Sequence, residues 1–250
     1  MPRFFITDGS LTSETTEAVL TGDEARHVAL SLRMAVGEEL TLSDGRGREY
    51  RCCLSAITPE RVTATVLSSS LSDTEYPFSL RLFMAYPKGD KLETVIEKAV
   101  ELGATAITPF LSSRCVRRPA EEKGARLLAR YNKIALAAAG QCGRATLPEV
   151  TETLTFREAI AAAADCELAL FCYEGEGTAP VARVLEGVSS PRSVAVIVGS
   201  EGGFSPEEAA AAQAAGLTPV GLGKRILRCE TAPLVALSCL GYRYGFGQKE

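Results

Sequence analysis

The residues most suggestive of chemistry form a glycine-rich stretch between an apolar run and a helix start. Residues 198–208 read Val-Gly-Ser-Glu-Gly-Gly-Phe-Ser-Pro-Glu-Glu. In open α/β sheets ligands bind beyond the carboxyl ends of strands, and glycines let a ligand approach the backbone amides. The stretch lacks the Gly-Lys-Ser/Thr of an ATP-binding loop and the G-x-G-x-x-G of a dinucleotide site. It favours an unusual nucleotide-like ligand, although turns of this kind also occur without a ligand.

A second stretch places an arginine directly before another helix start. Residues 222–232 read Leu-Gly-Lys-Arg-Ile-Leu-Arg-Cys-Glu-Thr-Ala. Glu230 has a simple structural interpretation, because a carboxylate near a helix N-terminus complements the helix dipole. Arg228 has no such explanation. At this position an arginine is suited to binding an anion or the polar edge of a base.

The elements that must position these stretches divide the chain into two parts. Residues 1–72 contain short extended runs, a turn signal at 44–47 and one helix near 21–34, which predicts a small, mostly β, barrel-like domain. The polar run 68–73 is interpreted as a linker. Residues 73–250 alternate apolar strands with helices, so we expect an α/β domain with a parallel sheet. Its predicted strands are 80–86, 106–110, 167–173 and 193–198, and its predicted helices begin near Asp90, Ala120, Thr155, Ser205 and Thr231. Capping boxes are predicted at two of these starts, formed by Thr155 with Glu158 and by Ser205 with Glu208.

Composition excludes several classes of protein. The chain has 250 residues, is 46% hydrophobic and carries 27 basic against 31 acidic residues, which is typical of a globular protein. It has no apolar run of the roughly 18 residues that span a bilayer and no recognisable signal peptide, so we expect a cytoplasmic protein without a membrane partner. The eight cysteines form no C-x-x-C pair and His27 is the only histidine. We therefore expect reduced thiols, no metal site and no Ser-His-Asp triad.

The two glycine stretches together resemble the ribosomal RNA small subunit methyltransferase E family. Further segments that are similar to family segments occur in the expected order along nearly the whole chain. They are residues 3–5, 86–93, 97–103 and 141–144. The chain departs from the family in having Ser200 where Pro is usual, which affects loop stiffness, and Gly140 where Glu is usual.

The resemblance implies a SPOUT-class methyltransferase whose C-terminal domain contains a trefoil knot. It implies S-adenosylmethionine as the cofactor, bound in the knot, and methylation of N3 of one uridine in 16S rRNA. It also implies a PUA-like N-terminal barrel that helps to hold RNA, and a homodimer. The implied partners are 16S rRNA or the small ribosomal subunit, and a second copy of the chain.

A set of candidate site residues follows from the two stretches and the resemblance. Charge that develops on the uracil oxygens needs hydrogen-bond donors, and Arg228 and Arg114 are the candidates. Glu201 and Glu101 are candidates for accepting the N3 proton if desolvated, and release of that proton to solvent stays open. The predicted cofactor-binding residues are Phe171, Val198, Gly199, Glu201, Gly202, Gly203, Leu222, Gly223, Ile226, Leu227, Arg228 and Thr231.

An acidic chain can bind RNA through a local basic patch. Residues 114–144 contain eight basic and two acidic residues. For Lys123, Arg126 and Arg130 a solvated helix face explains the charge, whereas the arginines of the loop 114–118 favour RNA contact. The predicted RNA-binding residues are Arg3, Lys88, Arg114, Arg117, Arg118 and Arg144.

Two other functions compete with uridine methylation. One is a SPOUT methyltransferase acting on another RNA, for instance on a tRNA ribose 2′-hydroxyl. The other is a non-catalytic RNA-binding factor in ribosome assembly. The glycines, Arg228 and residues 230–232 are intact, which argues against loss of activity.

Overall fold

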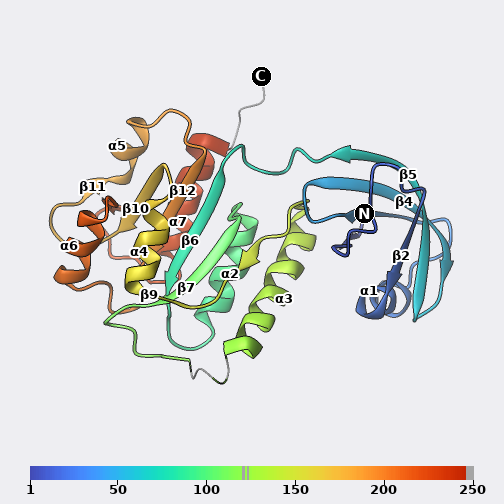
Figure 1. Ribbon diagram of the computed structural model, residues 1–250, viewed down its shortest axis with the longest axis horizontal. Coiled ribbons are helices and arrows are strands. Elements are labelled where there is room, and N and C mark those ends of the chain that lie inside the picture. Colours follow the sequence, from blue (N-terminus) through green and yellow to red (C-terminus); the bar gives the residue numbers. More distant parts are fainter. Residues whose placement is uncertain (120–121, 123, 246–250) are drawn as a thin grey trace. The chain divides into compact units, whose positions relative to one another are not determined.

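The computed structural model describes residues 1–119, 122 and 124–245. It divides the chain into two compact units (Figure 1). The first contains Met1–Glu75 together with Ala139–Leu147, and the second contains Tyr76–Ala138 together with Pro148–Glu250. The segment Ala139–Leu147 thus belongs to the first unit although it lies far along the chain, which local sequence patterns cannot indicate.

The first unit is built on one five-stranded sheet. The sheet order is β1-β3-β4-β5-β2, in which only the β1–β3 pair is parallel. A short helix α1 and a single π-helical turn η1 follow β2, within the range where a helix was expected. The bounds are β1 Arg3–Phe5, β2 Glu17–Thr21, α1 Gly22–Arg26, η1 His27–Ser31, β3 Glu39–Ser43, β4 Arg48–Ile57 and β5 Arg61–Leu71.

The predicted linker at residues 68–73 is wrong for most of its length. Ser68–Leu71 is the end of β5 and pairs with Arg48–Arg51 of β4. The exposed serine side chains give this segment the composition of a linker, but its backbone groups are paired with the neighbouring strand β4.

The second unit contains a parallel sheet in the order β11-β13-β10-β12-β6-β7-β8, with β9 also pairing with β7. Strands β10 and β12 are buried along nearly their whole length, as expected for a parallel sheet covered on both faces. The bounds are β6 Ser79–Ala85, β7 Ala106–Leu111, β8 Glu149–Val150, β9 Leu154–Thr155, β10 Leu168–Cys172, β11 Ala179–Pro180, β12 Ser193–Val198 and β13 Thr218–Gly221.

Helices connect these strands, and two of them begin with the capping boxes that the sequence predicts. Thr155 and Glu158 cap α4, and Ser205 and Glu208 cap α6. Helix α7 packs against β12 and α2 (Figure 1). The expected start of the third helix at Ala120 lies outside the described residues. The bounds are α2 Lys91–Glu101, α3 Gly124–Cys142, α4 Phe156–Ala164, α5 Val181–Glu186, α6 Pro206–Ala214, α7 Ala232–Leu240 and the π-helical turn η3 Gly241–Gly245.

The expected fold class, a parallel-sheet α/β domain with a smaller N-terminal β domain, is confirmed. Within the described residues, no helix is both long and apolar enough to cross a bilayer. The same residues contain no group of three or more side chains that could hold a metal ion. All eight cysteines are free thiols.

Candidate functional site

A cavity of about 500 Å³ lies at the carboxyl ends of β10, β12 and β13. Both glycine-rich stretches line it, as do the residues that directly follow β10. This volume is typical of a small-ligand site, and the carboxyl edge of a parallel sheet is where such sites occur. The lining comprises Lys91, residues 172–174, Thr178, residues 198–201, Gly203, residues 220–229 and Ala232.

The first bend, residues 199–205, turns tightly between β12 and α6. Gly203 adopts a φ of +62° and its N–H donates to the Ser200 carbonyl at 2.9 Å. A Cβ on Gly199 would lie 3.1 Å from the Gly203 backbone, so neither position has room for a side chain without movement. The glycines therefore allow the backbone itself to form the wall of the cavity.

The second bend, residues 222–231, joins β13 to α7. Gly223 has a φ of +120°, and a Cβ there would meet no atom within 4 Å. The Arg228 carbonyl accepts hydrogen bonds from the N–H groups of Thr231 and Ala232, at 2.9 and 3.0 Å, where α7 begins. The Ile226 side chain lines the cavity and is 88% exposed, which is unusual for an aliphatic residue of this size.

Lys91, the first residue of α2, connects the two bends. Its Nζ lies 3.0 Å from Glu201 Oε1 in the first bend and 3.2 Å from Glu230 Oε2 in the second. Hydrogen bonds to these two carboxylates raise the pKa of Lys91 to about 12. Sequence reasoning missed Lys91. The available signal was a lysine at a helix N-terminus, where the dipole disfavours a cation.

Glu201 is held in its ionised form. Burial opposes ionisation, but hydrogen bonds from its own backbone N–H, from Lys91 and from the Lys88 N–H outweigh this and lower its pKa. A carboxylate with a lowered pKa is a poor proton acceptor at neutral pH. The hydrogen bonds therefore outweigh the desolvation that would raise its basicity, and its role in catalysis stays a prediction.

The two arginines predicted as hydrogen-bond donors differ in their relation to the cavity. The Arg228 side chain lines it and is 84% exposed, with Nη1 4.0 Å from Glu230 Oε1. Arg114 lies outside the lining, and its Nη1 donates to the Gly202 carbonyl of the first bend at 3.0 Å. Arg228 is thus the better placed of the two predicted donors to reach a bound molecule.

Comparison with known proteins agrees with this geometry. The model of the RNA methyltransferase domain family matches residues 74–241, and that of the RNA methyltransferase PUA domain matches residues 20–67. The ribosomal RNA small subunit methyltransferase E of Bacillus subtilis is 32% identical over 97% of both chains. The protein of the same name from Mycobacterium bovis is 35% identical over 90% of this chain and 86% of its own.

This chain belongs to the ribosomal RNA small subunit methyltransferase E family.

Solved structures support the assignment. The methyltransferase E of Neisseria gonorrhoeae, bound to S-adenosylmethionine, has a TM-score of 0.87 at 32% identity and covers 98% of both chains. A putative methyltransferase of Legionella pneumophila, in complex with the same cofactor, has a TM-score of 0.85 at 30% identity over 96% of both chains. The RNA methyltransferase fold with an N-terminal PUA domain is thereby confirmed.

The structure brings nine of the twelve predicted cofactor residues to the cavity and leaves out three. Phe171 is fully buried, with its ring centroid 4.3 Å from that of Phe204, so it belongs to the core. Gly202 faces Arg114, whose Cβ lies 3.0 Å from where a Gly202 Cβ would be. Thr231 is the N-cap of α7 and does not line the cavity, although Cys229 and Ala232 on either side of it do. Conversely, Lys91, Tyr173, Glu174 and Thr178 line the cavity although the two sequence stretches do not contain them.

Four of the six predicted RNA-binding residues lie on segments close to the first bend. The Lys88 N–H bonds Glu201, Arg114 bonds Gly202, and Arg117 donates to the Gly89 carbonyl with its guanidinium over the Tyr86 ring. Arg118 is exposed. Lys123, named in the basic patch, lies outside the described residues.

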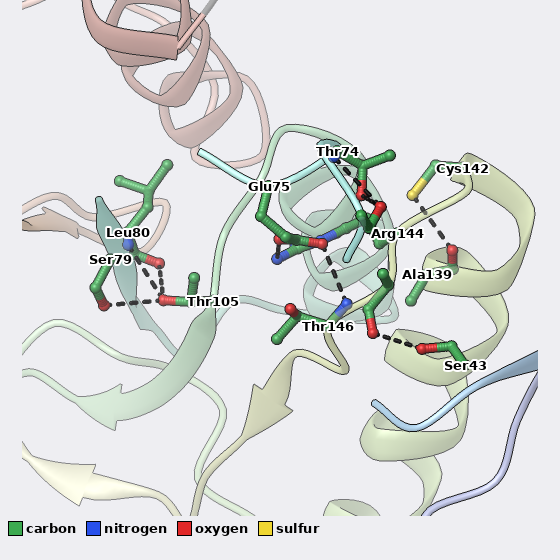
Figure 2. A network of polar contacts seen from close by, with 12 residues as sticks. Ser43, Thr74, Glu75, Ser79, Leu80, Thr105, Ala139, Cys142, Arg144 and Thr146 are labelled. Carbon is green, nitrogen blue, oxygen red and sulfur yellow. Dashed lines mark hydrogen bonds and ion pairs between the residues drawn. The ribbon is translucent and has the colours of Figure 1, made fainter. Parts of the chain in front are cut away.

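Arg3 and Arg144 are corrections to the predicted RNA-binding set. Arg144 is 4% exposed and is paired with Glu75, with Nη2 2.6 Å from Oε2 (Figure 2). Arg3 is mostly buried and its Nη1 lies 2.5 Å from Glu49 Oε1. Each guanidinium is thus committed to a carboxylate inside the first unit and is not available to a phosphate.

The two residues that depart from the family pattern, Ser200 and Gly140, have defined surroundings. Ser200 is buried, and its hydroxyl donates to the Arg114 carbonyl at 3.4 Å. Gly140 lies in α3, where an added Cβ would come no nearer than 3.8 Å to the Arg3 carbonyl.

Proposed function

We propose that this protein uses S-adenosylmethionine to methylate N3 of a specific uridine in 16S rRNA. The observation that carries the proposal is the convergence of both glycine bends on one ligand-sized cavity at the carboxyl edge of the sheet. Membership of the methyltransferase E family supports the 16S rRNA substrate. The N3 position rests on the resemblance described above.

The residues around the cavity fit this cofactor. Val198, Leu222 and Leu227 offer apolar surface for an adenine ring, and the adjacent bends expose backbone amides for its polar edge. The carboxylates of Glu174 and Glu201 supply negative charge for a molecule that carries a sulfonium and an ammonium group. A ligand seated there would also cover the exposed Ile226 side chain.

When bound, S-adenosylmethionine supplies an electrophilic methyl group. The task of the protein is then to hold the uracil ring in line, and positioning of this kind can contribute roughly 7–11 kcal/mol. Arg228 is placed to donate to the uracil oxygens as charge develops on them. Because the pKa of Glu201 is lowered, we infer that the N3 proton leaves to solvent, assisted by Arg228.

The proposed RNA contacts are Lys88, Arg114, Arg117 and Arg118. Arg114 and Lys88 contact the first bend through Gly202 and Glu201, which ties the basic loop to the wall of the cavity. RNA bound along this loop would therefore lie beside the cofactor, as the reaction requires. The target base must leave any stacked helix to react.

The test is to incubate the protein with isotopically labelled S-adenosylmethionine and small-subunit RNA from cells that lack this modification. Free 16S rRNA and assembled subunits are tested separately, and the labelled nucleoside is identified by mass spectrometry. Label in 3-methyluridine is the expected result. Label on a ribose hydroxyl, or no label in either substrate, would contradict the proposal.

A further inference from the structure

The ammonium group of Lys91 is the point at which the two glycine bends meet. Glu201 lies between the glycines of the first bend and Glu230 lies near the end of the second, and both carboxylates lie within 3.2 Å of Lys91 Nζ. The Lys88 N–H also donates to Glu201, at 3.0 Å. The start of α2 therefore fixes segments that are more than a hundred positions away in the sequence.

The position of Lys91 at the start of α2 is electrostatically unfavourable for a cation. A lysine at the first position of a helix faces the positive end of the dipole, and here it is also partly desolvated. The side chains of Lys91, Glu201 and Glu230 are only 34%, 29% and 25% exposed. Two carboxylates that contact the same ammonium group would repel one another without that cation.

We propose that Lys91 is a positioning residue that holds the two glycine bends together and so sets the shape of the cofactor cavity. The inference rests on the proposed function, since it assigns the cavity to S-adenosylmethionine. Without the ammonium, Glu201 and Glu230 repel one another, the bends separate, and the cofactor has to pull them together again when it binds. Lys91 also lines the cavity, so movement at this point changes the cavity itself.

Cys229 adds a second contact to the same cluster. Its thiol donates to Glu230 Oε2 at 3.2 Å, and Lys91 Nζ lies 3.8 Å from its sulfur. Burial, followed by the hydrogen bond to Glu230, raises the pKa of this thiol to about 12, so it stays protonated and neutral. The thiol therefore contributes no charge, and Lys91 is the cation that both carboxylates share, while the exposed Arg228 guanidinium lies farther off, 4.0 Å from Glu230.

The test compares Lys91→Met, Lys91→Arg and Lys98→Met in the full-length protein. Lys98 is the matched control because it lies on the same helix and pairs with two carboxylates, Glu97 and Glu101, at 2.7 Å each, away from the cavity. S-adenosylmethionine affinity is measured by calorimetry, Tm by thermal unfolding, and KM separately for cofactor and RNA. If Lys91→Met does not fold, Lys91→Gln takes its place.

We expect Lys91→Met to weaken cofactor affinity about tenfold, equivalent to about 1.4 kcal/mol, with KM for RNA unchanged. Lys91→Arg should restore affinity because a guanidinium can bridge two carboxylates, and Lys98→Met should bind as the wild type does. Adding Glu230→Gln to Lys91→Met should recover part of the loss, because it removes the repulsion.

Each other outcome overturns a distinct claim. Unchanged affinity in Lys91→Met, or an equal loss in Lys98→Met, would reject the positioning role while leaving the proposed function in place. A wild-type protein that does not bind S-adenosylmethionine at all would reject the proposed function itself.

Discussion

Arg144 donates hydrogen bonds to both carboxylate oxygens of Glu75, a residue 69 positions earlier in the chain (Figure 2). Glu75 also accepts from the Thr146 N–H at 3.2 Å, and the Ser43 hydroxyl donates to the Ala145 carbonyl at 2.6 Å. These contacts attach the segment Ala139–Leu147 to the first unit. A residue that reads as part of a basic RNA patch is therefore structural.

Removing one partner of this buried pair is expected to destabilise the protein. Arg144→Met leaves the Glu75 carboxylate without its cation, which should lower the free energy of unfolding by about 3 kcal/mol in urea titrations. The double variant Arg144→Met/Glu75→Gln should be more stable than the single variant. Normal stability combined with weaker rRNA binding in Arg144→Met would instead restore Arg144 to the RNA interface.

Backbone strain at Gly223 gives a test of the cofactor loop. Gly223→Ala introduces a Cβ at a φ of +120°, which costs about 1–2 kcal/mol or more because L-residues avoid this region. Since the added atom meets nothing nearby, the loop is expected to change conformation, and S-adenosylmethionine affinity measured by calorimetry should fall.

Gly216→Ala is the matched control for Gly223→Ala. Gly216 follows α6, has a φ of +93° and likewise has open space at its Cβ position, but it is not part of the cavity lining. It should lower Tm without lowering cofactor affinity. Equal losses of affinity in the two glycine variants would show that general destabilisation, and not the shape of the loop, is responsible.

Arg118 provides the cleanest test of the RNA surface. Arg114 and Arg117 also support backbone carbonyls, whereas Arg118 is exposed, so Arg118→Ala should leave the loop in place. Loss of one phosphate contact to single-stranded RNA should reduce the slope of log affinity against log salt concentration by about 0.7. The control is Arg192→Ala. The Arg192 side chain is exposed and lies directly before β12, at the amino ends of the strands and therefore away from the cavity, so this variant should keep the wild-type slope.

The pH dependence of turnover distinguishes the two routes for the N3 proton. The pKa of Glu201 lies below the usual glutamate value of about 4.3, so this carboxylate is fully ionised from pH 6 to pH 9. Any change of kcat across that range at saturating cofactor must come from another group. Glu201→Gln should therefore keep the shape of the wild-type profile, and a changed shape in this variant would show that Glu201 titrates in this range and can accept the proton.

The sequence by itself determined the elements that depend on neighbouring residues. The capping boxes at Thr155 and Ser205 occur as expected, because a cap is a contact between a residue and the backbone three positions on. The strand at 193–198 and both glycine bends were also readable, since burial on both faces and a positive φ leave local compositional signals.

Only the tertiary structure decided which charged side chains are free and which are committed. Lys91, Glu201 and Glu230 come together from three distant segments, and Arg144 is buried and paired with Glu75 rather than exposed to RNA. Phe171, an apparent wall of the cavity, is instead covered by Phe204. An ion pair or a packed ring depends on the position of a partner in space, and a chain folded through long-range strand pairing brings together partners that no local pattern connects.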